Sequence, residues 1–279
     1  MLSKQVKKIH CWGGLGSQFY AISLAIDLHS TYSNLELIFH NSGVTRRDLE
    51  AEDFVKSFFP YVTNNDFSKK LELSSDKVIV KTYSKRLISN LFFALNLLNH
   101  ANTDEEFRKI RIWTYIIRGH YSYRTQNLAT IKQMLERFMF FYGQLIQKSS
   151  IVVHYRLDDI IKIDGKTVIS SERVIEGIKE SNCSGTIRIY SDSAKELQNR
   201  FEGKFQNKYE VSDLSTEHLV VNAISAECFV GTVSKVSFWI VFFRLANNTN
   251  SINLMPIESR PHLVTALVNL RPYKNLIFY

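Results

Sequence analysis

Short apolar runs alternate with helical patterns in the second half of the chain, and this alternation limits the possible folds more than any other feature. Such runs suit buried strands, and the patterns between them have the spacing of helices. Repeated strand–helix units predict an α/β fold with a parallel, doubly wound sheet. The strands expected here cover residues 150–155, 186–191 and 228–231, and the helices 170–181, 194–201, 219–226 and 237–247.

The first half opens with the same kind of unit. Residues 9–12 end a predicted strand, a tight turn follows from Gly13 to Gln18, and residues 19–28 carry apolar side chains at helical spacing. These glycines are not spaced as in the dinucleotide-binding fingerprint, but glycine still allows a backbone to approach a ligand closely. Further predicted strands cover residues 35–40, 78–82 and 110–117, and further helices 53–59, 86–100 and 128–147.

The length and the pattern together predict two domains. The 279 residues fit one large domain or two of ordinary size, and the pattern changes near residues 148–150. We therefore expect an α/β domain over 1–148, a second over 149–279, and a cleft between them.

The net charge of +8 is concentrated in the first half. Residues 1–150 hold 20 Lys and Arg against 13 Asp and Glu, whereas residues 151–279 hold 15 against 14. Nucleic acid, a membrane surface or a pyrophosphate-bearing substrate could each meet such a face. A basic face that is solvated and has no partner is the alternative.

Cysteine use and hydropathy indicate a cytoplasmic protein. Cys11, Cys183 and Cys228 are far apart in sequence and odd in number, which favours neither a disulfide framework nor a zinc site. The first ten residues lack the apolar stretch of a signal peptide. Residues 87–98 form the most apolar run, which is too short to span a bilayer and is expected to be a buried helix.

Charged residues follow the predicted strand at 150–155 directly. In open α/β sheets, ligands lie beyond the carboxyl ends of the strands. The guanidinium of Arg156 could form two charge-assisted hydrogen bonds to a phosphate there, with Asp159 orienting it. A strand end capped by a salt bridge is the alternative.

Several stretches in the same order resemble the motifs of the bacterial α-1,2-fucosyltransferase family. The resemblance spans residue 13 to about residue 240. Gly13–Gln18 resembles the family motif GGLGNQ, and Gly119–Tyr121 resembles a GY-aromatic motif. Further along, His154–Asp159 resembles HxRRGD, Ile189–Asp192 resembles FSDD, and Val233–Trp239 resembles NSSFSWW.

The departures from these motifs bear on the donor and the linkage. Ser17 stands in place of Asn, Leu157 in place of the second Arg, and Asp158 in place of Gly. Of the last motif, the residues that clearly remain are Ser234, Ser237 and Trp239. The sugar donor and the acceptor linkage therefore stay open.

The resemblance implies a GT-B architecture of two Rossmann-like domains facing a central cleft. The C-terminal domain would bind GDP-fucose or another GDP-linked deoxysugar, and the N-terminal domain would shape the acceptor site. The implied reaction is an inverting, metal-independent transfer to a glycan hydroxyl in O-antigen or capsule biosynthesis. A lipid-linked acceptor at the inner face of the membrane, with peripheral contact by the enzyme, would suit the basic first half. No cofactor is implied.

The chemistry of such a transfer explains the residue types. Negative charge grows on the leaving diphosphate, and a metal or fixed donors must stabilise it. The chain has no Asp-x-Asp triplet of the kind that metal-dependent glycosyltransferases use. Arg156 would serve instead, together with Ser234, Lys235 and Ser237 near a helix N-terminus. The alternative for the two serines is ordinary helix capping.

Other candidate residues take their roles from the resemblance. His154 would lie near the nucleotide base, or be an ordinary histidine at a strand end. Asp164 is placed near an acidic base, although its Asp-Gly pair also suits a turn. Asp192 would meet the ribose or the base edge, or cap the next helix.

The glycine turn is the candidate site element of the first domain. Gly13, Gly14 and Gly16 would let the backbone approach the cleft beside Ser17, and Gln18 would reach toward the sugar.

Two other functions fit parts of the sequence. A non-catalytic relative that binds a nucleotide sugar is compatible with Leu157 and Ser17. A basic nucleic-acid-binding protein is supported by the charge alone, since the sequence has no helix-turn-helix, zinc finger or aromatic-basic RNP pattern. The favoured interpretation therefore includes no nucleic-acid partner.

Overall fold

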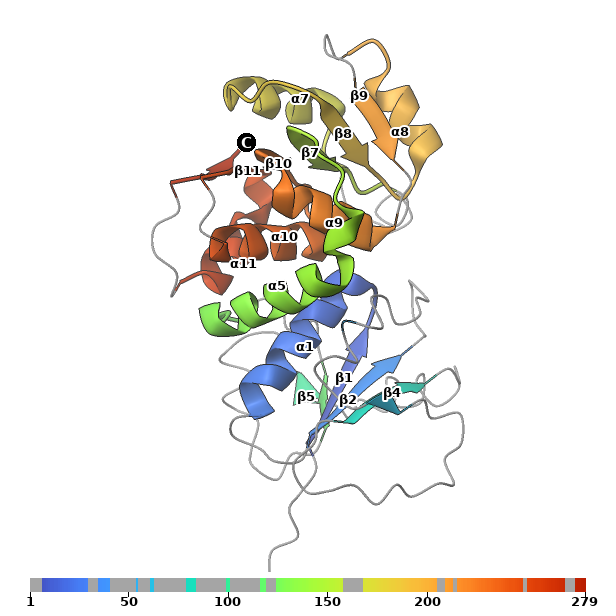
Figure 1. The fold of residues 1–279 in the computed structure, drawn as a ribbon, viewed down its shortest axis with the longest axis vertical. Helices are drawn as coiled ribbons and strands as arrows, with labels where there is room; N and C mark the ends of the chain where they lie inside the picture. The colour runs from blue at the N-terminus through green and yellow to red at the C-terminus, as the bar shows by residue number, and fades with distance from the viewer. Residues whose placement is uncertain are drawn as a thin grey trace, which may run out of the picture. The chain divides into compact units, whose positions relative to one another are not determined.

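The chain forms two compact units in the computed structural model (Figure 1). The first comprises residues 1–137 and 265–269, and the second 138–264 and 270–279. The expected split into an acceptor-side domain over 1–148 and a nucleotide-sugar domain over 149–279 stays a prediction. The structure describes residues 7–29, 35–40, 54, 61–62, 79–83, 99–100, 116–118, 124–157, 168–204, 209–212, 215–247, 250–268 and 274–279.

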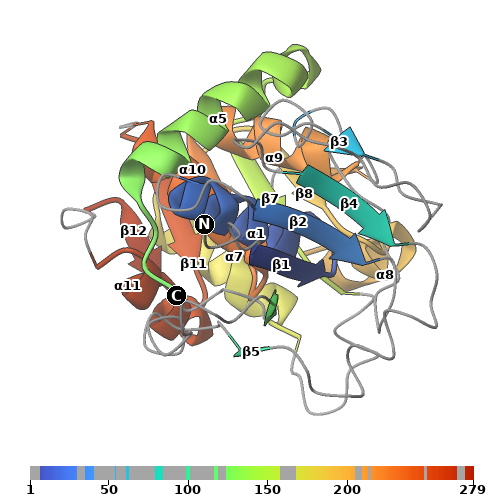
Figure 2. The ribbon, with the colours of Figure 1, turned by 90° about the horizontal axis from the view of Figure 1, so that it is seen from below.

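The first unit contains a parallel sheet, of which Figure 2 shows β1, β2 and β4 side by side. Its described strands are ordered β3-β4-β2-β1-β6-β5, so β1 has a neighbour on each side. The strands are β1 (Lys7–Trp12), β2 (Leu35–His40), β3 (Tyr61–Val62), β4 (Ile79–Tyr83), β5 (Asn99–His100) and β6 (Ile116–Arg118).

Two helices contribute to the core of this unit. Helix α1 (Leu15–His29) is apolar around most of its surface, and Phe19 and Ile22 are fully buried. Helix α5 (Leu128–Tyr142) begins in this unit. Polar contacts join the two segments: Ser23 Oγ donates to Gln126 Oε1 at 2.9 Å, and Thr130 Oγ1 donates to Asp27 Oδ1 at 2.6 Å.

The structure corrects several expected elements of the first half. Asn99 and His100 belong to a strand, so the helix predicted over 86–100 is wrong at its end. The predicted strand 110–117 includes the first two residues of β6, and its other residues lie outside the described part of the chain. Helix α5 ends at Tyr142 rather than at residue 147, because a 3₁₀ turn, η1 (Gly143–Leu145), leads into extended backbone at Ile146.

The second unit is built on a parallel sheet with the order β12-β11-β10-β7-β8-β9. Numbered from β7 as the first strand, this is the Rossmann order 3-2-1-4-5-6. The strands are β7 (Ile151–His154), β8 (Ile187–Tyr190), β9 (Tyr209–Ser212), β10 (Cys228–Val230), β11 (Ile252–Met255) and β12 (Leu276–Phe278).

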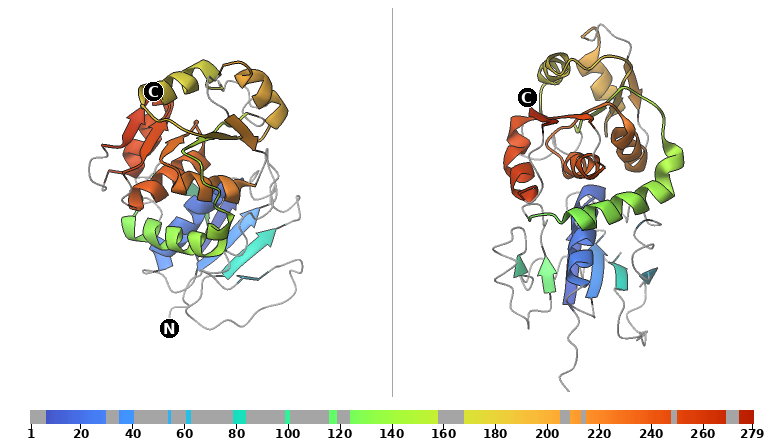
Figure 3. Two further views of the ribbon diagram at one scale, coloured as in Figure 1. Left: turned by 45° about the horizontal axis from the view of Figure 1, so that its top comes forward. Right: turned by 60° about the vertical axis from the view of Figure 1, so that its left-hand side comes forward.

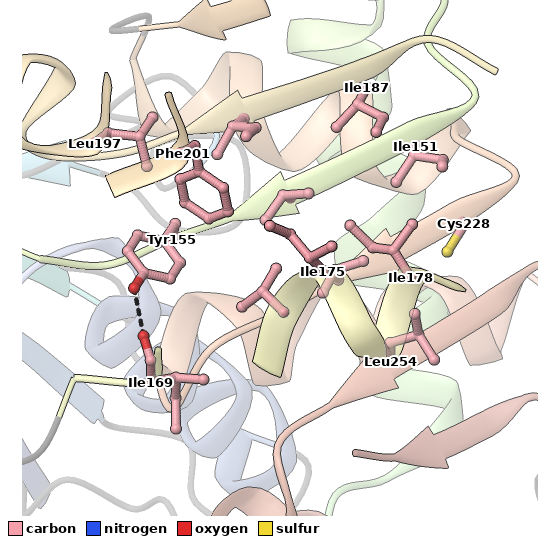
Figure 4. Close-up of a cluster of buried hydrophobic side chains, with 14 of the residues drawn as sticks. Ile151, Tyr155, Ile169, Ile175, Ile178, Ile187, Leu197, Phe201, Cys228 and Leu254 are labelled. Carbon is pink, nitrogen blue, oxygen red and sulfur yellow. Dashed lines mark hydrogen bonds between the residues drawn. The ribbon is translucent and has the colours of Figure 1, made fainter. Parts of the chain in front are cut away.

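Helices cover both faces of this sheet, as Figure 3 shows. Side chains of α7 and α8 pack with one face of the strands (Figure 4), and α9 and α10 lie against the other. The helical elements are α7 (Ser171–Glu180), α8 (Ala194–Phe201), α9 (Thr216–Ser225), α10 (Lys235–Ala246), η2 (Ile257–Ser259) and α11 (Arg260–Ala266).

The apolar core explains why β7 carries no polar face. Ile151 and Val153 join the cluster with α7 and α8, whereas Val152 points to the opposite, equally buried face. Just beyond the strand, Tyr155 and Leu157 are also fully buried. Each such side chain contributes roughly 1.5–3 kcal/mol by leaving water, so the chain is firmly held up to Leu157.

A buried arginine on α10 links this helix to the segments beside β10 and β11. Arg244 on α10 donates through Nε to Asn253 Oδ1 at 2.6 Å and through its terminal nitrogens to the carbonyls of Ala226 at 2.8 Å, Glu227 at 3.2 Å and Ile252 at 3.1 Å. Burial lowers its pKa to about 10. Arg244 therefore stays charged at neutral pH and pairs the carbonyls that follow α9, which places β10.

The predicted α/β class with two Rossmann-like sheets is confirmed, and how the two domains face one another stays a prediction. Five of the described elements of the second unit were not predicted: β9, β11, η2, α11 and β12. No helix in the described part of the chain is long and apolar enough to cross a bilayer.

Candidate functional site

The strand order of the second unit places a candidate site between β7 and β10. These neighbouring strands pair in parallel, with Val153 opposite Val230. The chain continues from β7 toward β8 on one side and from β10 toward β11 on the other. At such a switch point the loops diverge, and ligands bind beyond the carboxyl ends of the strands.

Thr232 joins the two strand ends. Its hydroxyl donates to the carbonyl of His154 at 3.0 Å and accepts the backbone N–H of Arg156 at 3.3 Å. From the other side, the N–H of Tyr155 donates to the carbonyl of Tyr190 at 2.8 Å. The backbone that carries the half-buried Arg156 is therefore held by both neighbouring strands.

His154 and Ser237 meet across the same two segments. His154 Nδ1 lies 2.8 Å from Ser237 Oγ, which also accepts the N–H of Thr232 at 3.3 Å. Ser237 therefore contacts both the ring of His154 and the backbone N–H of Thr232.

Helix α10 begins at this place with a basic first turn. Ser234 is its N-cap and accepts the N–H of Val236 at 3.2 Å, so the capping alternative describes this side chain. Lys235 is the first helical residue, and the first turn has no acidic residue. A cation is unfavourable at the positive end of a helix, whereas an anion is stabilised there. This turn therefore suits an anionic ligand.

Asp192 positions the chain after Arg156. Its Oδ1 accepts the N–H of Leu157 at 2.7 Å. The position that holds a second Arg in the resembling motif is occupied here by the fully buried Leu157.

Gly231 allows the close packing between β10 and its surroundings. A Cβ added to Gly231 would lie 2.4 Å from Met255 Sδ and 2.9 Å from Ser237 Cβ. Any other residue would displace the side chain of Met255 and press on Ser237 in the first turn of α10. Glycine therefore sets the distance between the strand end and the helix that carries Ser237.

The glycine turn of the first unit has a defined geometry. Gly13 has a φ of 105°, which favours glycine, and the carbonyl of Gly14 accepts the N–H of Ser17 at 2.9 Å and of Gln18 at 3.1 Å. Gly16 already lies within α1. The buried Gln18 donates through Nε2 to the carbonyl of Gly13 at 3.2 Å, which braces the turn. Its predicted reach toward a sugar stays a prediction.

Two predicted site residues, Asp159 and Asp164, lie outside the described part of the chain, as do Asp158 and the motif stretch Gly119–Tyr121. Within the described part, no three His, Cys, Asp or Glu side chains form a group that could hold a metal ion.

Two cysteines that are distant in sequence interact in the second unit, since burial and the neighbouring Cys183 raise the pKa of the Cys228 thiol.

Sequence reasoning missed Thr232, although a signal was available. The residue follows a predicted strand directly and precedes Ser234, so the carboxyl ends of parallel strands could have brought it to Arg156. It did not identify Gly231 as a packing position, because nothing local indicates the approach of Met255.

The sequence matches no family model and no curated protein. Among solved structures, NodZ α-1,6-fucosyltransferase soaked with GDP-fucose is similar at a TM-score of 0.44 and 10% identity, covering 86% of this chain and 93% of that one. POFUT1 in complex with GDP gives 0.38 and 12%, with 91% and 99% covered. A glycosyl transferase family 9 protein from Veillonella parvula DSM 2008 gives 0.39 and 7%, with 91% and 81% covered.

Proposed function

We propose that this protein is a glycosyltransferase that uses a GDP-sugar donor. It moves L-fucose or a related deoxysugar to a hydroxyl of a glycan acceptor, with inversion and without a metal ion. The observation that carries the proposal is the assembly at the β7–β10 switch point. There, Thr232 fixes the backbone of Arg156, and the basic first turn of α10 begins.

The proposed site suits a nucleoside diphosphate. Arg156 and Lys235 supply positive charge, and the first turn of α10 supplies backbone N–H groups. Because the hydroxyl of Thr232 holds the backbone of Arg156 before the donor arrives, the main chain there needs little rearrangement as charge develops.

The reaction itself needs few steps. An acceptor hydroxyl attacks the anomeric carbon, the bond to the β-phosphate oxygen breaks, and GDP leaves with the bonding electrons. The hydroxyl proton passes to a base, for which Asp164 is the candidate, with Asp159 orienting Arg156. His154 would face the base of the nucleotide, and Asp192 the ribose or base edge.

The acceptor side is proposed for the first unit. The glycine turn at Gly13 and Gly14 would approach the acceptor with its backbone. A lipid-linked glycan acceptor of O-antigen or capsule biosynthesis would place the enzyme at the inner face of the cytoplasmic membrane. The excess of positive charge in residues 1–150 supports contact with anionic lipid.

Calorimetric titration with GDP, UDP and CMP tests the donor class. We expect GDP to bind and the other two not to bind measurably. Binding of UDP or CMP without GDP would exclude a GDP-sugar. Transfer assays with intact GDP-fucose then separate an enzyme from a non-catalytic binding protein, since the latter would bind the donor but release neither GDP nor product.

A further inference from the structure

A tyrosine outside the predicted motifs contacts the candidate site from the far side of β11. Tyr279 directly follows β12 and Thr232 follows β10, so both residues lie beyond the carboxyl ends of strands in the same parallel sheet. Its hydroxyl donates to the carbonyl of Gly231 at 2.9 Å. The next residue, Thr232, donates its N–H to Ser237 and contacts the backbone of both His154 and Arg156.

We propose that Tyr279 is a positioning residue for the donor phosphates. Its hydroxyl fixes the peptide between Gly231 and Thr232, and this peptide in turn aligns the groups that face the diphosphate. The inference rests on the proposed function and extends it to a residue that does not itself touch the donor.

The surroundings of Tyr279 hold the ring in one place. A Cβ added to Gly177 on α7 would lie 2.9 Å from Tyr279 Cγ, so glycine is what admits the ring. Arg173, one helical turn earlier, donates to the Tyr279 carbonyl at 2.8 Å, and its guanidinium carbon lies 5.8 Å from the ring centroid. The guanidinium also binds both carboxylate oxygens of Glu258.

Backbone hydrogen bonds also hold Tyr279 in place. The N–H of Tyr279 donates to the carbonyl of Met255 at 2.9 Å, and its carbonyl accepts the N–H of Ile257 at 2.9 Å. The phenol remains a hydrogen-bond donor across the neutral range, because burial raises the pKa of Tyr279. A rigidly held donor therefore meets the Gly231 carbonyl.

Tyr279→Phe isolates the hydroxyl, because the ring and its packing remain. We expect the dissociation constant for GDP to rise about 3- to 10-fold, the value of one hydrogen bond, and that for guanosine to stay the same. A purely structural loss would weaken both ligands together. Ser181→Ala is the control, since it removes another hydroxyl, at the end of α7, which donates to the Ile178 carbonyl and accepts the N–H of Cys183.

Gly177→Ala tests the same contact from the helix. Alanine favours the helix but pushes the Tyr279 ring away from α7, which should disturb the hydrogen bond to Gly231. We expect the same selective loss of GDP affinity, and this variant decides the matter if Tyr279→Phe does not fold.

Calorimetry with GDP and guanosine separates the possible failures. A wild-type protein that does not bind GDP overturns the proposed function and this inference together. Wild-type binding with unchanged affinities in both variants overturns the inference alone. Equal loss for GDP and guanosine also overturns it, because the role would then be structural.

Discussion

At the scale of single residues, the candidate site contains two positively charged residues, Arg156 and Lys235, whose main chain is positioned by uncharged groups. Arg156 is held through its backbone by the hydroxyl of Thr232, and Lys235 is placed by the start of α10. The main chain at both residues is therefore fixed by groups that carry no charge. We expect changes to these two side chains to alter function more than stability.

Arg156→Ala should lower the transfer rate by ~10²–10³, the usual cost of losing one preorganised donor to a developing anion. The half-buried side chain makes no contribution to the apolar core, so we expect little change in melting temperature. Steady-state kinetics with GDP-fucose and a thermal melt measure the two effects. Near-normal activity would contradict the role assigned to Arg156.

Lys235→Ala should weaken GDP binding about tenfold, because a charge-assisted hydrogen bond from a half-buried lysine is worth roughly 1.5 kcal/mol. Lys179→Ala is the control, since Lys179 is an exposed lysine in the last turn of α7. The two dissociation constants are compared by calorimetry at two salt concentrations. Equal effects of the two substitutions would show that Lys235 has no specific part.

At the scale of elements, pairs of groups between α7 and the segment after β11 stabilise the second unit. Arg173 on α7 forms two hydrogen bonds with Glu258, and this contact lowers the pKa of the Glu258 carboxyl. Because the folded-state pKa is depressed, the contribution is present above the ordinary value of 4.5 and is lost as the pH falls below it.

Glu258→Gln should therefore flatten the acid side of the stability profile. At pH 7 the variant should lose about 0.2–1 kcal/mol, a small value because both partners are partly exposed. As the pH falls through the lowered pKa of the Glu258 carboxyl, the two proteins should converge. Urea melts between pH 3 and pH 7 measure this difference, and a constant gap across the range would mean that the pair does not act through its charge.

At the scale of the whole molecule, the sequence predicted the elements that hydrophobic periodicity identifies and the site residues that directly follow a strand. Residues 150–155 and the switch from strand to charged residues identified β7 and Arg156. The three-residue β12 and the Asn-interrupted β11 are too short or too polar to predict locally. The contact of Tyr279 with Gly231 depends on the packing of β12 beside β11, which no local pattern encodes.

GDP should stabilise the whole protein if the proposed site is correct. At 100 times the dissociation constant, binding adds ~2.7 kcal/mol to the free energy of unfolding. The melting temperature should rise with GDP, with or without EDTA, and stay constant with UDP. Loss of the GDP shift on adding EDTA would contradict a metal-independent site.

The place of β7 in the strand order also affects how the protein folds during synthesis. β7 pairs with β8, which follows it closely, but its other partner is β10, more than seventy residues later. The ribosome must therefore release a long stretch before that edge of β7 is covered, and such late, distant pairing is slow and leaves a strand edge exposed. We expect the nascent chain to need protection by a chaperone during this interval.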